Sequence, residues 1–159
     1  MPHRVMLSSM LRIVSVAHEP SALYSRADVL HPIRVMTALK SYDEELNCIA
    51  LGHELLNKTS VTVDDLVIAG MSDRVIRGII LFKDAPTPAQ TLDNISSTYD
   101  TIRVAMPCLL DRGALADTAN VSRKTAKKIE AYHRAYLRMA GLVNGAETCK
   151  LLGLQHPFF

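Results

Sequence analysis

Residues 46–59 read LNCIALGHELLNKT. The apolar residues of this stretch recur every three or four positions, the spacing of one helical face, and His53 falls on that face. A buried imidazole needs a partner, because an unpaired polar group in an apolar interior is costly. Two interpretations fit this position. His53 is either a core histidine satisfied by hydrogen bonds or a metal ligand acting with the adjacent carboxylate of Glu54.

The chain has the length and composition of one ordinary domain. It contains 159 residues, of which 48% are hydrophobic, and this is enough to bury a core without further crosslinks. The formal net charge is +2, from 18 basic and 16 acidic residues, so the overall field of the protein does not attract nucleic acid. We therefore expect a single domain over residues 1–159. Nucleic-acid binding through a local basic stripe at residues 123–128 is the weakest of the functions that the sequence leaves open.

The cysteines and the N-terminus indicate the compartment. Cys48, Cys108 and Cys149 are far apart and lack CxxC spacing, so they suggest neither a disulfide framework nor a zinc knuckle. The N-terminal segment lacks the uninterrupted apolar core of a signal peptide. No run approaches the roughly 18 apolar residues of a membrane span. We expect a soluble cytoplasmic protein.

Helical spacing and helix-capping residues recur along the whole chain. The first predicted helix runs from about residue 5 to His18, and residues 84–90, DAPTPAQ, form the clearest loop and the expected mobile lid. No segment alternates apolar and polar residues, so we expect an all-α fold. Predicted helix starts are marked by Pro32, Asp43, Thr62 with Asp65, Ser72, Pro107 and Ser122.

Few polar residues fall where these helices should converge. His31 lies at the N-terminal mouth of a helix, and His53 and Glu54 lie near a helix end. Asp117 stands inside the apolar run ALAD. Two imidazoles and two carboxylates suit a hard or borderline divalent ion, although the sequence alone does not show that the four side chains meet.

The order of these residues on an all-helical chain resembles the HD-domain metal-dependent phosphohydrolases. The stretches HPIRVM, ALGHELLNKTSVTVDDL, AGMSDRV, YDTIRVAMP and LADTANVSR resemble in particular the hydrolase domains of the SpoT type and the small stand-alone (p)ppGpp hydrolases. The resemblance covers about residues 5–140 and leaves residues 141–159 as a C-terminal extension. It implies a helical bundle with a metal pocket between helices.

Carried over by position, the resemblance implies a set of metal ligands. His31, His53, Glu54 and Asp117 stand where the family holds its metal, which we expect to be Mn²⁺, with Fe²⁺ as another choice. Asp111 competes with Asp117 for the last ligand position. The surroundings of Asp117 reproduce more of the family's pattern, and Asp111 is interpreted as a solvated surface acid.

Two positions depart from the family. The second motif reads His53-Glu54 where the family has His-Asp, and Asn57-Lys58 replace a Glu-Asp pair that is thought to handle the attacking water. Neither an amide nor an ammonium can act as a carboxylate base. A metal can lower the pKa of its own bound water, which would leave Lys58 to neutralise phosphate charge. The plainer interpretation of Lys58 is a solvated residue at a helix end.

The resemblance also implies contacts with a nucleotide. Lys83 matches a basic position of the family, Asn120 would read a base or ribose, and Tyr132 would stack on the base. Tyr132 is equally compatible with a core position, since it lies four residues from Tyr136 on one helix. Arg112 and Arg123 are further phosphate-facing candidates. The basic cluster of Arg123, Lys124, Lys127 and Lys128 is interpreted as a solvated helix face.

The sequence therefore predicts a metal-dependent nucleotide phosphohydrolase that acts on (p)ppGpp or a related nucleotide. Glu54, Asn57 and Lys58 occupy its catalytic positions. The alternative is a catalytically impaired module of the same fold that binds a nucleotide or a protein, because both family carboxylates are replaced. The sequence leaves the oligomeric state open, and a homo-oligomer is compatible with either function.

Overall fold

The computed structural model describes residues 3–18, 29–115, 123–153, 155 and 158. Every regular element within these ranges is a helix, which confirms the all-α prediction. The helices are α1 (His3–Ala17), α2 (Leu30–Leu39), α3 (Glu44–Gly52), α4 (Leu55–Lys58), α5 (Val63–Ile68), α6 (Asp73–Leu81), α7 (Pro88–Ile95), α8 (Tyr99–Leu115) and α9 (Arg123–Leu151).

Side-chain caps begin three of these helices where the sequence predicts them. Asp43 at the start of α3 and Ser72 at the start of α6 each accept a hydrogen bond from the backbone N–H three residues further on. Thr62 and Asp65 form a reciprocal capping box at the start of α5. These bonds satisfy backbone donors that the first helical turn leaves without a partner.

The helix predicted to run through His53 is interrupted. α3 ends at Gly52 and α4 begins at Leu55, so His53 and Glu54 lie in the turn between them. A new turn starts at Glu54, whose carbonyl oxygen accepts hydrogen bonds from the backbone N–H groups of both Asn57 and Lys58. In a continuous helix the side chains of two consecutive residues point about 100° apart, so they do not share one face. The turn instead allows both His53 and Glu54 to be buried.

The prediction that Pro107 opens a helix is wrong. α8 begins at Tyr99, and Pro107 lies in its interior. An interior proline removes one backbone hydrogen bond and costs about 3 kcal/mol. Burial of the apolar face of α8, with Ile102 and Val104 fully enclosed, offsets this loss.

The loop predicted over residues 84–90 is shorter than expected. α7 begins at Pro88, inside the DAPTPAQ segment, and Thr87 and Gln90 form a capping box there. Proline is tolerated at the first helical position because its missing N–H would have no helical partner. The Ala85 N–H donates to Thr91 Oγ1 at 2.9 Å, which ties the loop to α7. The expected lid is therefore partly the start of a helix.

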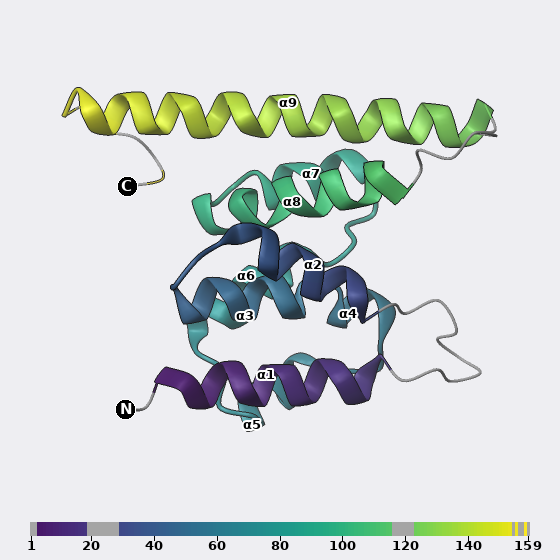
Figure 1. Ribbon diagram of the computed structural model, residues 1–159, viewed down its shortest axis with the longest axis vertical. Helices are drawn as coiled ribbons and strands as arrows, with labels where there is room; N and C mark the ends of the chain where they lie inside the picture. The colour runs from purple at the N-terminus through teal and green to yellow at the C-terminus, as the bar shows by residue number, and fades with distance from the viewer. Residues whose placement is uncertain (1–2, 19–28, 116–122, 154, 156–157, 159) are drawn as a thin grey trace.

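The helices stack in layers, with α1 along one edge of the molecule and α9 along the opposite edge (Figure 1). α3 lies between them and packs against α1, α2, α6 and α8. None of the described helices combines length with enough apolar character to cross a membrane. The largest fully buried side chains include Met10, Val14, Val35, Leu46, Ile49, Leu51, Val75, Ile79, Ile102 and Met139.

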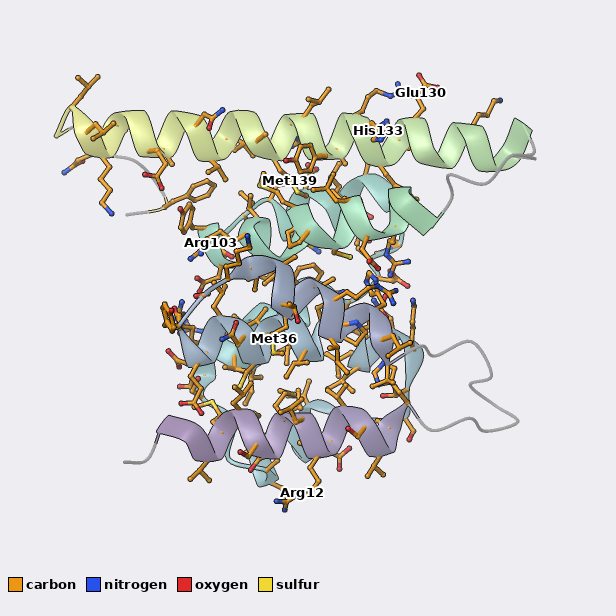
Figure 2. The ribbon with its side chains drawn as sticks, in the orientation of Figure 1. Arg12, Met36, Arg103, Glu130, His133 and Met139 are labelled. Atoms are coloured by element: carbon orange, nitrogen blue, oxygen red, sulfur yellow. The ribbon has the colours of Figure 1, made fainter. Side chains whose placement is uncertain are left out.

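α9 packs along α8 and extends past it at both ends (Figure 1). Met139 is buried on the side of α9 that faces α8, whereas Glu130 is on the opposite, exposed side (Figure 2). The Tyr99 hydroxyl donates to Glu147 Oε1 at 2.8 Å and fastens α9 to the start of α8. The helix continues without a break through residue 140, where the predicted C-terminal extension begins.

Candidate functional site

His31 is held in the first turn of α2 with its ring buried. Its Nδ1 donates a hydrogen bond to Asp111 Oδ2 at 2.6 Å. In the neutral imidazole, Nε2 then carries the lone pair that a metal needs. Burial acts to lower the pKa of His31, but the hydrogen bonds to Cys108 and Asp111 raise it overall.

His53 is the second buried imidazole, and it comes from the turn after α3. Its Nδ1 donates to the carbonyl oxygen of Ala50 at 2.6 Å, so its available nitrogen is also Nε2. That Nε2 is buried and has no hydrogen-bond partner among the described residues. The ring centroids of His31 and His53 lie 5.3 Å apart, which brings together two residues that the sequence singled out.

Cys108 of α8 completes a cluster with the two histidines. Its Sγ lies 3.4 Å from His31 Nε2, and one ligand atom from each of the three residues lies within 4.8 Å of the other two. Burial alone would raise the pKa of the Cys108 thiol, but the imidazoles of His53 and His31 hold it well below its usual value. This buried group of two imidazoles and a thiol could bind a metal ion.

The sequence analysis did not single out Cys108. It stands in an apolar helical run, where a thiol resembles any small core residue. One signal was present in the sequence, because Cys108, Asp111 and Arg112 are three and four residues apart and therefore share one face of a helix. All three side chains point to the same centre, through contacts with His31 and Glu54.

Glu54 borders the cluster and is almost fully buried. Its Oε1 lies 3.6 Å from His31 Nε2 and accepts hydrogen bonds from Lys58 Nζ, at 2.7 Å, and from Arg112 Nη2. Its Oε2 is buried, and within the part of the chain that the structure describes it has no hydrogen-bond partner. Burial would raise the pKa of Glu54, but the charges of His53, Lys58 and Arg112 lower it. The carboxylate therefore stays ionised beside the two imidazoles.

The interpretation of Asp111 as a solvated surface acid is wrong. Its side chain is 16% exposed, and it accepts one hydrogen bond from His31 and two from Arg34, at 2.7 and 3.1 Å. The hydrogen bonds from Arg34 and His31 lower the pKa of this carboxyl group. Asp111 thus orients a potential metal ligand through Nδ1, the arrangement in which a carboxylate supports a metal-bound imidazole.

A cavity of about 400 Å³ opens beside the cluster. His53, Glu54 and Cys108 line one part of it, and Lys58 and Arg112 supply positive charge there. The rest of the described wall is mainly apolar and comes from α4, the segment after α6, α7, α8 and α9. Its apolar members include Phe82, Leu92, Ile95, Leu109 and Met139.

Some of the remaining predicted residues line the cavity and others do not. Asn57 and Tyr132 line the cavity. Asn57 uses both ends of its amide on backbone groups, donating to the Phe82 carbonyl at 2.8 Å and accepting from the Asp84 N–H at 2.9 Å. Lys83 is exposed and is not among the described lining residues.

Other predicted residues cannot be placed. Asp117 and Asn120 lie outside the described residues, as does the Ser122 cap. Of the basic cluster at the start of α9, Lys127 is exposed, in agreement with a solvated face.

No protein-family model and no curated protein matches this chain. The case for a function therefore depends on the chemistry of the cluster and its cavity. Two imidazoles, a thiol and a carboxylate meet beside a cavity that is also lined by two cations. Such a site suits a cation held by the protein and an anionic ligand in the cavity.

Proposed function

We propose that the protein is a divalent-metal-dependent phosphohydrolase that acts on a nucleotide phosphate such as (p)ppGpp. The observation that carries the proposal is the buried pair of His31 and His53, each with Nδ1 hydrogen-bonded to a protein oxygen and Nε2 left to face the cluster, beside a cavity lined by Lys58 and Arg112. The resemblance of the sequence to the HD-domain phosphohydrolases of the SpoT type supports the same function.

The metal would be held by His31, His53 and Glu54, with Asp117 as the expected further ligand. The fit is supported by two buried atoms that no described residue pairs with by a hydrogen bond, His53 Nε2 and Glu54 Oε2. Isolated polar atoms of this kind are costly unless something occupies the space between them. A bound divalent ion would polarise a phosphoryl oxygen and lower the pKa of a coordinated water. Mn²⁺ is the ion expected for imidazole and carboxylate donors alone.

Lys58 and Arg112 would bind the phosphate groups. Both cations now pair with Glu54 Oε1, and both side chains also line the cavity. A phosphate in the cavity would compete with Glu54 for these donors and release the carboxylate toward the metal ligands. Fixed cations beside a transferring phosphoryl group stabilise the charge that develops on its oxygens.

The remaining predicted residues take roles at the edges of this cavity. Asn57 would maintain the wall, because its amide holds the backbone of Phe82 and Asp84 in place. Tyr132, half-buried on α9, would stack on the nucleotide base. Lys83 would reach an outer phosphate from the exposed rim.

The test is an assay of the purified protein with Mn²⁺, Fe²⁺ or Zn²⁺ against guanosine and adenosine phosphates that include (p)ppGpp. We expect metal-dependent release of phosphate or pyrophosphate, and a loss of at least about a hundredfold in His53→Ala. The matched control is His133→Ala, since His133 is an exposed histidine on α9 (Figure 2). The proposal fails if no substrate turns over with any metal and His53→Ala changes nothing.

A second candidate is a protein that binds the nucleotide without hydrolysing it. It is favoured by the ion pairs of Glu54 with Lys58 and Arg112, because a carboxylate with a lowered pKa is a weak proton acceptor. Calorimetry with the same nucleotides separates the two functions. Nucleotide binding that depends on Lys58 and Arg112, with no turnover under any metal, would establish the second.

A further inference from the structure

The thiol of Cys108 is buried against the two histidines of the proposed metal site. We infer that Cys108 is itself a ligand, and that the site is a two-histidine, one-cysteine centre that takes a thiolate-preferring divalent ion, Zn²⁺ or Fe²⁺, over Mn²⁺. The inference rests on the metal site of the proposed function. It does not require that the bound ion catalyse hydrolysis.

The first support is the distance between the donors. A zinc ion about 2.0 Å from an imidazole nitrogen and 2.3 Å from a thiolate sulfur, in tetrahedral geometry, sets these two atoms about 3.5 Å apart. Cys108 Sγ and His31 Nε2 are 3.4 Å apart. The third donor lies within 4.8 Å of both, so the ring of His53 needs only a small shift to join them.

The second support is the orientation of both imidazoles. Asp111 accepts a hydrogen bond from Nδ1 of His31, and the Ala50 carbonyl accepts one from Nδ1 of His53. Both acceptors leave Nε2 as the nitrogen that faces the cluster. Acceptors that occupy the far nitrogen are the usual partners of metal-bound histidines, because they set the tautomer and hold the ring direction.

The third support is the unpartnered Nε2 of His53, a buried polar atom in the cluster. If Cys108 were only a small core residue, its weak S–H donor would be all that the described residues offer this nitrogen for its lost hydration. A shared ion satisfies Nε2 of His53 and the thiolate together. The thiolate is the donor that determines which ion the site selects. Soft sulfur ligands favour zinc and iron, whereas Mn²⁺ favours oxygen.

The site would keep one coordination position open. While Glu54 keeps its ion pairs with Lys58 and Arg112, the three donors His31, His53 and Cys108 leave a fourth tetrahedral position, and His53 and Cys108 both line the cavity. An exchangeable ligand in the cavity can therefore reach the ion. This is the arrangement of catalytic zinc sites, whereas structural sites close the fourth position with another side chain.

The experiment uses cobalt as a spectroscopic probe of the full-length protein. We expect Co²⁺ to bind and to give a thiolate-to-cobalt charge-transfer band in the near ultraviolet, together with the intense visible bands of a four-coordinate ion. The band should disappear in Cys108→Ser. Zn²⁺ affinity should fall about tenfold or more in that variant, as for other changes around metal ligands, while Mn²⁺ affinity stays close to that of the unaltered protein.

The matched control is Cys48→Ser. Cys48 is a buried thiol of α3, and burial together with the carboxylates of Glu44 and Glu45 raises its pKa to about 12. It is therefore not a thiolate, and its replacement should leave the band unchanged. Cys149→Ser, at the partly exposed thiol of α9, is the second control. A band in the unaltered protein that persists in both Cys48→Ser and Cys149→Ser decides the inference even if Cys108→Ser does not fold.

The possible outcomes separate the two proposals. Co²⁺ binding without the charge-transfer band would overturn the role of Cys108 and retain a metal site made by His31, His53 and Glu54. No binding of any divalent ion would overturn both the ligand role and the metal-dependent function. The band together with an absence of nucleotide hydrolysis would support the centre and reject the phosphohydrolase.

Discussion

At the scale of single residues, the site depends on the groups that accept hydrogen bonds from Nδ1 of its two histidines. His31 is held by Asp111, and Asp111 is in turn held by two hydrogen bonds from Arg34. His53 is held by the preceding helix, α3, through the carbonyl oxygen of Ala50. The two histidines are therefore oriented by different means, one by a distant charged side chain and one by a neighbouring backbone group.

This difference leads to a prediction for Asp111→Asn. The amide can still accept a hydrogen bond from His31, but it carries no charge and loses the paired geometry with Arg34. We expect Zn²⁺ affinity, measured by calorimetry, to fall about tenfold, with little change in thermal stability. The control is Asp84→Asn, at an exposed acid that lines the same cavity. Equal affinities in the two variants would show that Asp111 does not position the ligand.

At the scale of elements, the close contact of α3 with α6 sets the position of the His53 turn. A Cβ on Gly52 would lie 2.5 Å from Ile79 Cδ1, and a Cβ on Gly78 would lie 2.6 Å from Ile49 Cδ1. The two helices exchange these contacts in both directions, so each glycine makes room for an isoleucine of the other helix. Glycine here serves close approach of the helices, since neither residue has a positive φ.

The contact predicts opposite effects for two similar substitutions. Gly78→Ala should lower the free energy of unfolding by about 1–3 kcal/mol, because the methyl group meets the branched side chain of Ile49 inside a filled core. Gly145→Ala should raise it by about 0.5–1 kcal/mol, since nothing lies within 4 Å of its Cβ on α9 and alanine is the better helix former. Urea unfolding measures both values. The same sign for the two variants would contradict this account of the packing.

At the scale of the whole molecule, Arg74 links three parts of the chain. From α6, its guanidinium binds Asp43 and Glu45 at the start of α3 and Asp100 at the start of α8. Partial burial acts to raise the pKa of Asp43, but the hydrogen bond from Arg74 lowers it overall. A carboxyl group whose pKa is lower in the folded state stabilises the fold above its ordinary pKa, and this contribution disappears as pH falls through the folded value.

The variant Arg74→Met should therefore show a pH-dependent loss of stability. At neutral pH we expect the free energy of unfolding to fall by about 1 kcal/mol, a modest loss because these charges are partly exposed and screened. The difference from the unaltered protein should shrink as pH drops below 3.8, the ordinary pKa of Asp43. Arg77→Met, at an exposed arginine of the same helix, should stay within about 0.5 kcal/mol. A difference that grows in acid would contradict the ion-pair explanation.

Layering of the helices also explains how a cavity forms in so small a chain. Its described walls come from the turn before α4, from α4, from the segment after α6, and from α7, α8 and α9. α9 adds Tyr132 and Met139 from the far end of the sequence and covers α8 on the outer side (Figure 1). The predicted C-terminal extension and the predicted domain thus share one continuous helix.

The sequence by itself determined the helical class and several helix starts, since periodicity and the caps at Asp43, Thr62 and Ser72 are local properties of the chain. It also singled out His31 and His53, because imidazoles are unusual among apolar neighbours. The prediction that Pro107 begins a helix is wrong, because burial of the rest of α8 outweighs the cost of an interior proline.

Only the tertiary structure decided which side chains surround the two imidazoles. Cys108 and His31 are 77 positions apart in the sequence, and Asp111 and His31 are 80 apart. Helical periodicity identifies a buried face but not the residue opposite it, since that depends on the crossing of α2, α3 and α8. The thiol of Cys108 and the carboxylate of Asp111 therefore acquire their chemistry from packing, because each needs a partner that a distant part of the chain supplies.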